Sequence, residues 1–307
     1  MHADKTYVPW LILAGLVLTW GSSFILIKHG LAGLGYNSNI VGSLRISITF
    51  LVMLIPALLR LRRITPRQWK ILTVVGFINS GAPAYLFAYA QTGIDSNMAG
   101  ILNSLTPLFT LLIGLSFFRL HARWFNVLGI FAGLTGAIGL IYNSGNGGFI
   151  FNFHYAVFVL IATICYATSV NIIKTYLSDL DSVSITAFSF FIIGLPVTVY
   201  LIFFTDLTRL LSEGGDAWAG LGYVTILAVI GTAVALIFFN HLIKLTSALF
   251  ASSVTYMIPI IAIFWGIVDG ERFEWNYVAW ILLILGGVYL VNTKRLKNKK
   301  SKKSFAQ

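Results

Sequence analysis

Long apolar stretches, separated by short polar connections, follow one another along the whole chain. Each has roughly the length that an α-helix needs to cross a bilayer, about 20 residues. None alternates as the strands of a β-barrel do, and isolated strands cannot satisfy their backbone in lipid. The pattern therefore predicts an all-α membrane protein with ten transmembrane helices, over 8–28, 39–59, 69–90, 97–118, 124–142, 154–174, 183–204, 218–240, 248–268 and 276–293.

Composition supports the membrane location. Apolar residues make up 58% of the 307 residues and charged residues only 10%, whereas soluble domains average about 25% charged. The net charge of +11 does not indicate a nucleic-acid partner, because the basic residues gather at the ends of the apolar stretches. The first stretch has no convincing small-residue cleavage site, so we expect a retained span rather than a signal peptide.

The basic residues also predict the orientation. With the N-terminus in the cytoplasm, 17 of the 21 Lys and Arg residues lie on the cytoplasmic side, 3 lie on the other side, and Arg45 lies within a span. Positive charge is retained on the cytoplasmic side of membrane proteins. We therefore expect a multi-pass protein of the cell membrane with both termini in the cytoplasm, which an even number of spans satisfies.

The chain also contains an internal repeat. Aligning Pro107 with Pro259 gives an offset of 152 residues and places Phe87 opposite Phe239. Each copy contains apolar runs, a short polar break, a polar turn and a further apolar run rich in glycine. Internal repeats in a membrane chain are typical of secondary transporters.

A second likeness fixes the organisation of the halves. At an offset of 146 residues, the segment 20–28 resembles 166–174, so each half holds five spans. Because five is odd, the second half enters the membrane from the opposite side. The sequence thus predicts two inverted five-helix repeats, residues 1–146 and 147–293, followed by a basic cytoplasmic tail, 294–307. Such repeats place a substrate site near the midplane of the membrane.

Five short motifs resemble those of EamA-type members of the drug/metabolite transporter superfamily. They are W-G-S-S-F (Trp20–Phe24), L-R-I-S (Leu44–Ser47), S-L-T-P (Ser104–Pro107), Y-M-I-P (Tyr256–Pro259) and G-E-R-F (Gly270–Phe273). The resemblance covers nearly the whole chain and names no substrate. It implies ten helices, cytoplasmic termini, a central cavity and export of small molecules such as amino acids or drugs. It also implies a Glu after the fourth span, where this chain has Arg119.

Arg45 is the most informative single residue, because it is charged and lies inside the second span. A charged side chain at this depth costs a few kcal/mol unless it faces a cavity or a partner. We expect it to bind a substrate carboxylate through paired hydrogen bonds. The alternatives are a packing role against backbone carbonyls and a side chain that extends to the outer membrane surface.

Other polar and aromatic residues within the spans are candidates for the cavity wall. Amide side chains are costly in lipid, and deep aromatic rings suit a partly apolar solute. The predicted substrate-binding residues, besides Arg45, are Trp20, Ser23, Asn79, Tyr85, Asn103, Asn171 and Tyr256.

Pro107 and Pro259 are predicted to act in gating, because proline interrupts helical hydrogen bonding at matching places in the two halves. They can equally be static packing features. His241 is the candidate for proton coupling, since histidine titrates near neutral pH; an interfacial side chain is the alternative. The glycine stripe of the fifth span, Gly129 to Gly139, favours helix packing within the chain over a dimer contact.

These features predict a secondary transporter that exports amino acids or related small metabolites by alternating access through a central cavity. The alternative is an uncoupled, channel-like facilitator of small amphipathic solutes. No metal-binding histidine pair, catalytic triad or phosphate-binding loop stands out in the sequence, so an enzyme is not expected. We expect no cofactor and no metal. The expected partners are a small-molecule substrate and the lipid bilayer, with the chain a monomer or a weak homodimer.

Overall fold

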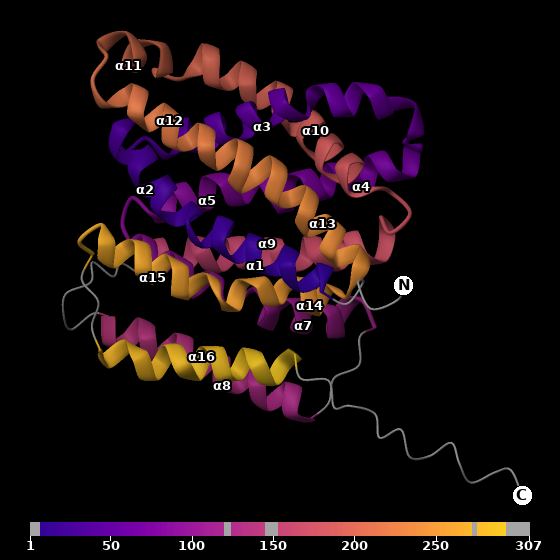
Figure 1. The fold of residues 1–307 in the computed structure, drawn as a ribbon, viewed down its shortest axis with the longest axis vertical. Helices are drawn as coiled ribbons and strands as arrows, with labels where there is room; N and C mark the ends of the chain where they lie inside the picture. The colour runs from indigo at the N-terminus through magenta and orange to yellow at the C-terminus, as the bar shows by residue number, and fades with distance from the viewer. Residues whose placement is uncertain (1–6, 120–123, 145–152, 272–274, 293–307) are drawn as a thin grey trace, which may run out of the picture.

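The fold was analysed in a computed structural model, which describes residues 7–119, 124–144, 153–271 and 275–292. Within these residues every regular element is a helix, and the helices form one bundle (Figure 1). The chain up to Ser144 forms α1 (Val8–Gly21), α2 (Ser23–Gly33), α3 (Ser38–Arg60), α4 (Pro66–Gly76), α5 (Ala82–Ala90), α6 (Ser96–Asn103), α7 (Thr106–Phe117) and α8 (Trp124–Ser144).

The remainder of the chain follows the same plan. It forms α9 (Phe153–Tyr176), α10 (Ser182–Phe204), α11 (Leu207–Glu213), α12 (Asp216–Ala228), α13 (Ala235–Leu245), α14 (Ala248–Ser252), α15 (Ile258–Val268) and α16 (Asn276–Asn292). Short segments of other helix types join several of these, namely the 3₁₀ helices η1 (Leu61–Arg63) and η4 (Ser253–Tyr256) and the π-helices η2 (Phe77–Gly81) and η3 (Val229–Val234).

Each of the ten predicted apolar stretches coincides with one helix or with helices that run on from one another. Among the described residues, eight helical stretches are long and apolar enough to cross a membrane, and two further apolar helices, Trp124–Gly136 and Tyr277–Gly287, are shorter. The all-helical membrane architecture is therefore confirmed, whereas the count of ten spans stays a prediction. The short amphipathic helix α11 was not predicted.

Large apolar side chains on the outside of the bundle indicate its surroundings. Leu59, Phe117 and Phe203 expose 74% or more of their surface. Exposed apolar area of this extent would promote association in water. Because the hydrocarbon of a bilayer is as apolar as these side chains, they face lipid at little cost.

Several helices are interrupted within a predicted span. Between α1 and α2 the hydroxyls of Ser22 and Ser23 donate to the carbonyls of Leu18 and Thr19, at 2.8 and 3.0 Å. Hydroxyl bonds of this kind compete with the backbone ladder and bend helices. At this interruption the first span lies close to α15, and a side chain at Gly21 would collide with Ile261.

Glycines join α8 to α16, which lie side by side at one edge of the bundle (Figure 1). A Cβ atom added at Gly287 would lie 2.5 Å from the Gly133 nitrogen and 2.6 Å from the Gly129 oxygen. These are backbone atoms, which cannot move aside as a side chain can. The glycine stripe therefore packs within the chain, as predicted.

Replacing Gly287 with alanine is expected to destabilise the protein by about 1–3 kcal/mol, because the added methyl must push the two helices apart. Gly286→Ala is the matched control, since no atom lies within 4 Å of its added Cβ. Thermal unfolding of both variants in detergent checks this. Equal unfolding temperatures for the two variants would contradict the close approach of α8 and α16.

Candidate functional site

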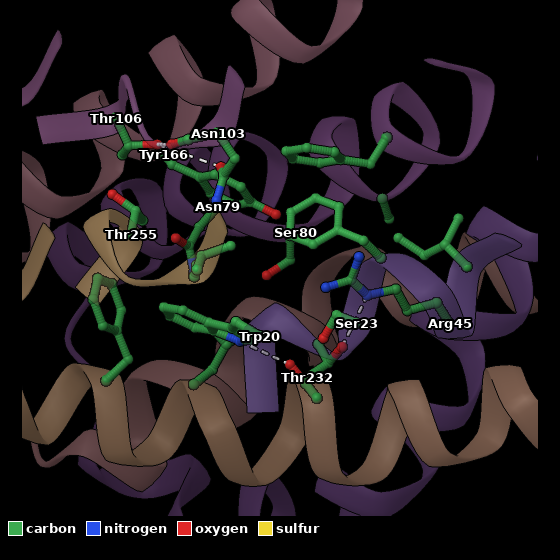
Figure 2. A pocket seen from close by; sticks show the side chains of 18 of the residues that line it. Trp20, Ser23, Arg45, Asn79, Ser80, Asn103, Thr106, Tyr166, Thr232 and Thr255 are labelled. Carbon is green, nitrogen blue, oxygen red and sulfur yellow. Dashed lines mark hydrogen bonds between the residues drawn. The ribbon is translucent and has the colours of Figure 1, made fainter. Parts of the chain in front are cut away.

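A cavity in the helix bundle encloses about 820 Å³ of space between protein atoms, part of it open to the surroundings. The lining comes from helices on both sides of the chain's midpoint, whereas no described residue of α8 or α16 contributes. The walls are largely apolar, with polar groups at a few places (Figure 2).

The structure brings five of the predicted binding residues together in this cavity. They are Trp20 from α1, Ser23 from α2, Arg45 from α3, Asn79 from η2 and Asn103 at the end of α6. They approach the space from different directions (Figure 2). Residues far apart in the sequence thus form one partly polar surface inside the bundle.

Arg45 is held at one edge of its guanidinium group. Its Nε donates to the Thr232 hydroxyl oxygen at 2.8 Å, and that hydroxyl donates to the Leu227 carbonyl at 2.9 Å. The hydroxyl proton of Thr232 is therefore bonded to the Leu227 carbonyl, and a lone pair of the hydroxyl oxygen accepts from Arg45. The remaining guanidinium nitrogens extend from α3 into the cavity (Figure 2). No described carboxylate forms an ion pair with Arg45.

Trp20 is held in a similar way by Gly231, the residue next to Thr232 in η3. Its indole Nε1 donates to the Gly231 carbonyl at 2.9 Å, and its ring meets that of Phe239 edge-on at 4.8 Å. Edge-to-face rings at this distance attract one another. The indole therefore forms an apolar part of the cavity wall.

Two π-helical segments supply polar groups to the cavity. Asn79 and Ser80 lie in η2, and Gly231 and Thr232 lie in η3. The segments start at positions 77 and 229, which are separated by the same 152 residues as the two prolines. π-Bulges displace backbone groups from the regular ladder and are frequent at functional sites. Their matching positions indicate that the interruptions are built into the fold.

Comparison with known proteins shows the family to which this chain belongs. A model of the EamA-like transporter family matches residues 7–142 and again 154–293. The chain belongs to the EamA-like transporter family. A curated protein of Archaeoglobus fulgidus, named only as an uncharacterized transporter, is 25% identical over 290 residues, which cover 93% of this chain and 99% of that protein. A solved crystal structure with 17% identity superposes with a TM-score of 0.64 over 92% of this chain and 95% of the other, and shows the fold alone.

Membership of the EamA-like family identifies the protein as a membrane transporter of the drug/metabolite transporter superfamily. The Archaeoglobus relative points to the same class, and to a transporter rather than an enzyme. Neither comparison names a solute. The properties of this EamA-like chain must therefore be argued from its own cavity.

Three predicted binding residues of the EamA-like chain lie away from the cavity. The Tyr85 hydroxyl is hydrogen-bonded to that of Ser43 at 2.8 Å. The Asn171 amide donates to the carbonyls of Thr110 and Ala167, at 3.0 Å each. Tyr256 is half-buried in η4 and is not part of the cavity lining. The first two therefore join helices of the scaffold.

The remaining predictions concern gating and proton coupling. Pro107 and Pro259 each stand in the first turn of a new helix, directly after an interruption at Asn103–Thr106 and at η4. Proline is well tolerated there because the first-turn N–H has no helical partner. His241 is exposed on α13 and does not line the cavity.

Other residues of the cavity lining were not predicted from the sequence. Thr232 was not singled out, although it orients Arg45, because a lone threonine in an apolar run carries little signal. Its place in the repeat was available, since Thr232 is the counterpart of Ser80 at the 152-residue offset. Tyr166, the counterpart of Trp20, also lines the cavity and lies close enough to Arg45 to interact with it electrostatically.

A second polar site lies at one end of the bundle. Lys28 Nζ lies 2.6 Å from an Asp269 oxygen and 2.9 Å from a Glu271 oxygen, and His29 Nε2 lies 3.0 Å from Asp269. Glu271 also accepts hydrogen bonds from the Ser96 nitrogen at 3.1 Å and hydroxyl at 2.7 Å, and from the Asn97 nitrogen at 3.2 Å. We call these residues the Lys28–Glu271 cluster. It joins the middle of α2 to the segment after α15 and to the first turn of α6.

Glu271 replaces the usual N-cap of α6. Asp95 occupies the N-cap position, yet its side chain makes no capping hydrogen bond. Burial, with the Glu271 carboxylate as a second cause, raises the pKa of the Asp95 carboxyl above its ordinary value, although Lys28 acts in the opposite direction. The Asp95 carboxylate is therefore an unfavourable neighbour of the cluster.

Asp95→Asn is expected to raise the unfolding temperature at pH 7. Because the pKa of Asp95 is higher in the folded protein than its ordinary value of 3.8, its ionisation lowers stability as the pH rises above that value. The gain should therefore disappear near pH 4. Thermal unfolding of the variant and the parent at both pH values checks this. A variant that is less stable at pH 7 would show that Asp95 supports α6.

Proposed function

We propose that the chain is a secondary transporter that exports amino acids or related small metabolites by alternating access through the central cavity. The observation that carries this proposal is the position of Arg45, a cation in the cavity wall with no carboxylate partner among the described residues. A solute that bears a carboxylate neutralises it during passage. Apolar walls around it suit the rest of a small metabolite.

The transport cycle requires two halves that move against each other. We infer ten spans in two inverted five-helix repeats, residues 1–146 and 147–293, before the basic tail 294–307. Two successive matches to the family model support this, as do the π-helical segments η2 and η3 at equivalent positions. With both termini in the cytoplasm, as the charge distribution favours, the Lys28–Glu271 cluster lies at the outer end.

The Lys28–Glu271 cluster is proposed to hold the outer end closed. Glu271 is only 3% exposed and accepts from groups on α2 and α6 at once. Opening that end must separate Lys28 from the two acids that follow α15. Pro107 and Pro259, each next to a break in its span, are the proposed positions at which the helices flex.

The cytoplasmic end is proposed to open through a different set of contacts. Lys174 donates to the carbonyls of Ile243 at 2.8 Å and Thr246 at 2.6 Å, and Lys244 donates to the Leu180 carbonyl. These bonds join α9 and the connection before α10 to the end of α13. The described ion pair at this end, between Arg60 Nε and Asp181, is 3.9 Å long, whereas those of the Lys28–Glu271 cluster are 2.6–3.0 Å long, so this end is less strongly held by charge.

An uncoupled facilitator is the second candidate. It is favoured by the absence of any Asp, Glu or His from the described cavity lining, since proton relays in transporters usually use such residues. Proton coupling through His241 would have to act from outside the cavity. Liposomes with an imposed pH gradient separate the two candidates, because accumulation of solute against its own gradient excludes a facilitator.

Counterflow tests the transport function itself. Purified protein is reconstituted in liposomes preloaded with one unlabelled solute from a panel of amino acids, amines and organic acids, and uptake of the labelled solute is followed. The proposal predicts exchange for a member that bears a carboxylate. Exchange for amines alone would overturn the assignment of solute class.

A further inference from the structure

The charge balance of the cavity bears on which of the proposed solutes, amino acids or related small metabolites, it favours. The inference rests on the proposed transport function. Arg45 is the one charged residue among the described residues of the lining. The described acids lie in loops or at helix ends. An isolated guanidinium in the membrane interior is costly, and an anion offsets that cost. A zwitterion adds a second, positive charge to the same small space.

The Arg45 side chain is prepared for an anion. Because Nε is bonded to Thr232 and the Tyr166 side chain interacts with the same group, the guanidinium cannot rotate freely; its other nitrogens are directed into the cavity (Figure 2). Ser80 is 6% exposed, and its hydroxyl has no hydrogen-bond partner among the described residues. Figure 2 shows that Ser80 faces the same space as the guanidinium. A carboxylate placed there accepts hydrogen bonds from both.

An α-ammonium group beside that carboxylate would find no carboxylate partner among the described lining residues. The backbone carbonyls near Arg45 already have donors: Trp20 donates to the Gly231 carbonyl at 2.9 Å, and the Thr49 hydroxyl is shared between the carbonyls of Arg45 at 2.7 Å and Ala228 at 3.0 Å. Thr232 uses a further nearby carbonyl, of Leu227. An ammonium on the carbon next to the carboxylate would therefore face Arg45 without an acid to balance it, and like charges held close together are costly.

Aromatic rings surround the rest of the space. Phe24 and Phe87 meet at 5.7 Å between ring centres, and Phe87 and Tyr166 stack at 5.9 Å. Rings of this kind contribute a large apolar surface and prefer to pack against other rings or branched chains. The solute that fits carries one negative charge and an apolar body.

We propose that the cavity binds organic monocarboxylates with an apolar body in preference to the zwitterionic amino acids of the same carbon skeleton. The carboxylate contacts Arg45 and Ser80, and the body lies between the rings of Trp20, Phe87 and Phe239. Recognition of this kind selects against free amines, whose charge has the same sign as the cavity.

Three probes with one carbon skeleton test the proposal: 3-phenylpropanoate, phenylalanine and 3-phenylpropylamine. Binding is measured by calorimetry on the purified protein in detergent. We expect 3-phenylpropanoate to bind at least about tenfold more tightly than phenylalanine, equivalent to about 1.4 kcal/mol, and the amine to bind most weakly. 3-Phenylpropanol is the neutral control and should bind less tightly than the acid.

Two variants test which residues cause the preference for 3-phenylpropanoate. Arg45→Gln should remove the advantage of 3-phenylpropanoate over 3-phenylpropanol, and Ser80→Ala should reduce it. Equal or tighter binding of phenylalanine would overturn the inference, and so would an unchanged advantage in Arg45→Gln. If counterflow shows exchange of amino acids that 3-phenylpropanoate does not inhibit, the inference fails and the transport function stands. If no solute in the panel exchanges, the proposed function fails.

Discussion

Arg45→Gln is expected to abolish saturable transport at solute concentrations that saturate the parent protein. Glutamine keeps much of the length of the side chain but loses the charge and the paired donors that bind a carboxylate. Loss of a charged hydrogen-bond partner in a desolvated site costs about 2–5 kcal/mol, which corresponds to at least a thirtyfold fall in kcat/KM. Initial rates of counterflow in liposomes measure this.

Two companion variants distinguish binding from folding. Arg45→Lys keeps the charge but not the paired geometry, so it should retain part of the activity. Thr232→Val removes the oxygen that accepts from Nε while keeping the shape of the residue, and it should raise KM more than it lowers kcat. Thermal unfolding in detergent checks that each variant is folded. Full activity with unchanged KM in a folded Arg45→Gln protein would eliminate the binding role.

Glu271→Gln is expected to lower the stability of the outer end and to increase its opening. The variant loses the charge that pairs with Lys28 and weakens the bonds to the first turn of α6. Hydrogen bonds to charged groups contribute about 1.5–3 kcal/mol each, so we expect a loss of at least about 2 kcal/mol. Amide hydrogen exchange at the start of α6 and the unfolding temperature report the change.

Asp95→Asn is the matched control, because it removes one negative charge beside the same cluster and should stabilise the protein. Lys28→Gln alone, and combined with Glu271→Gln, completes a double-mutant cycle. The coupling between these two residues should be favourable and larger than that between Lys28 and Asp95. Additive effects of Lys28→Gln and Glu271→Gln would show that the pair does not hold the end of the bundle together.

Apolar periodicity was sufficient to predict the helices, because a span that must exclude water leaves a long and unambiguous pattern. The breaks within the spans were harder to predict from the sequence. Ser22 interrupts the first span through side-chain bonds to its own helix, whereas Thr168 and Ser169 lie at the matching place in the uninterrupted helix α9. A hydroxyl pattern alone therefore does not predict a break; the packing of Gly21 against Ile261 distinguishes the two places.

Whether a polar residue within a span lines the cavity depends on whether a neighbouring helix offers it a partner. Arg45 was identifiable from its charge alone. Tyr85 and Asn171 looked equally suited to a cavity, but Ser43 and two backbone carbonyls satisfy them elsewhere. Polarity within a span shows that a residue faces protein, and only the three-dimensional arrangement shows whether it faces a cavity or a neighbouring helix.

The structure also changes which residue of the second half corresponds to Arg119. Each follows a helix that has a proline in its first turn. However, α7 is one residue longer than α15, with 12 residues against 11. The left-handed residue after each helix is Arg119, with φ +54°, and Gly270, with φ +81°. By backbone conformation Arg119 corresponds to Gly270, so its mismatch with Glu271 in the sequence alignment does not describe equivalent positions.

Protection of a cavity cysteine by solute tests the central claim most directly. Ser80→Cys is made in a Cys165→Ala background, which otherwise has no cysteine, and Ser212→Cys, exposed on α11, is the control. A thiol reagent is applied to protein in liposomes with and without a solute that shows counterflow. We predict that the solute slows labelling at position 80 and leaves position 212 unchanged. Labelling at position 80 that is unaffected by a saturating, transported solute would contradict a transport route through this cavity.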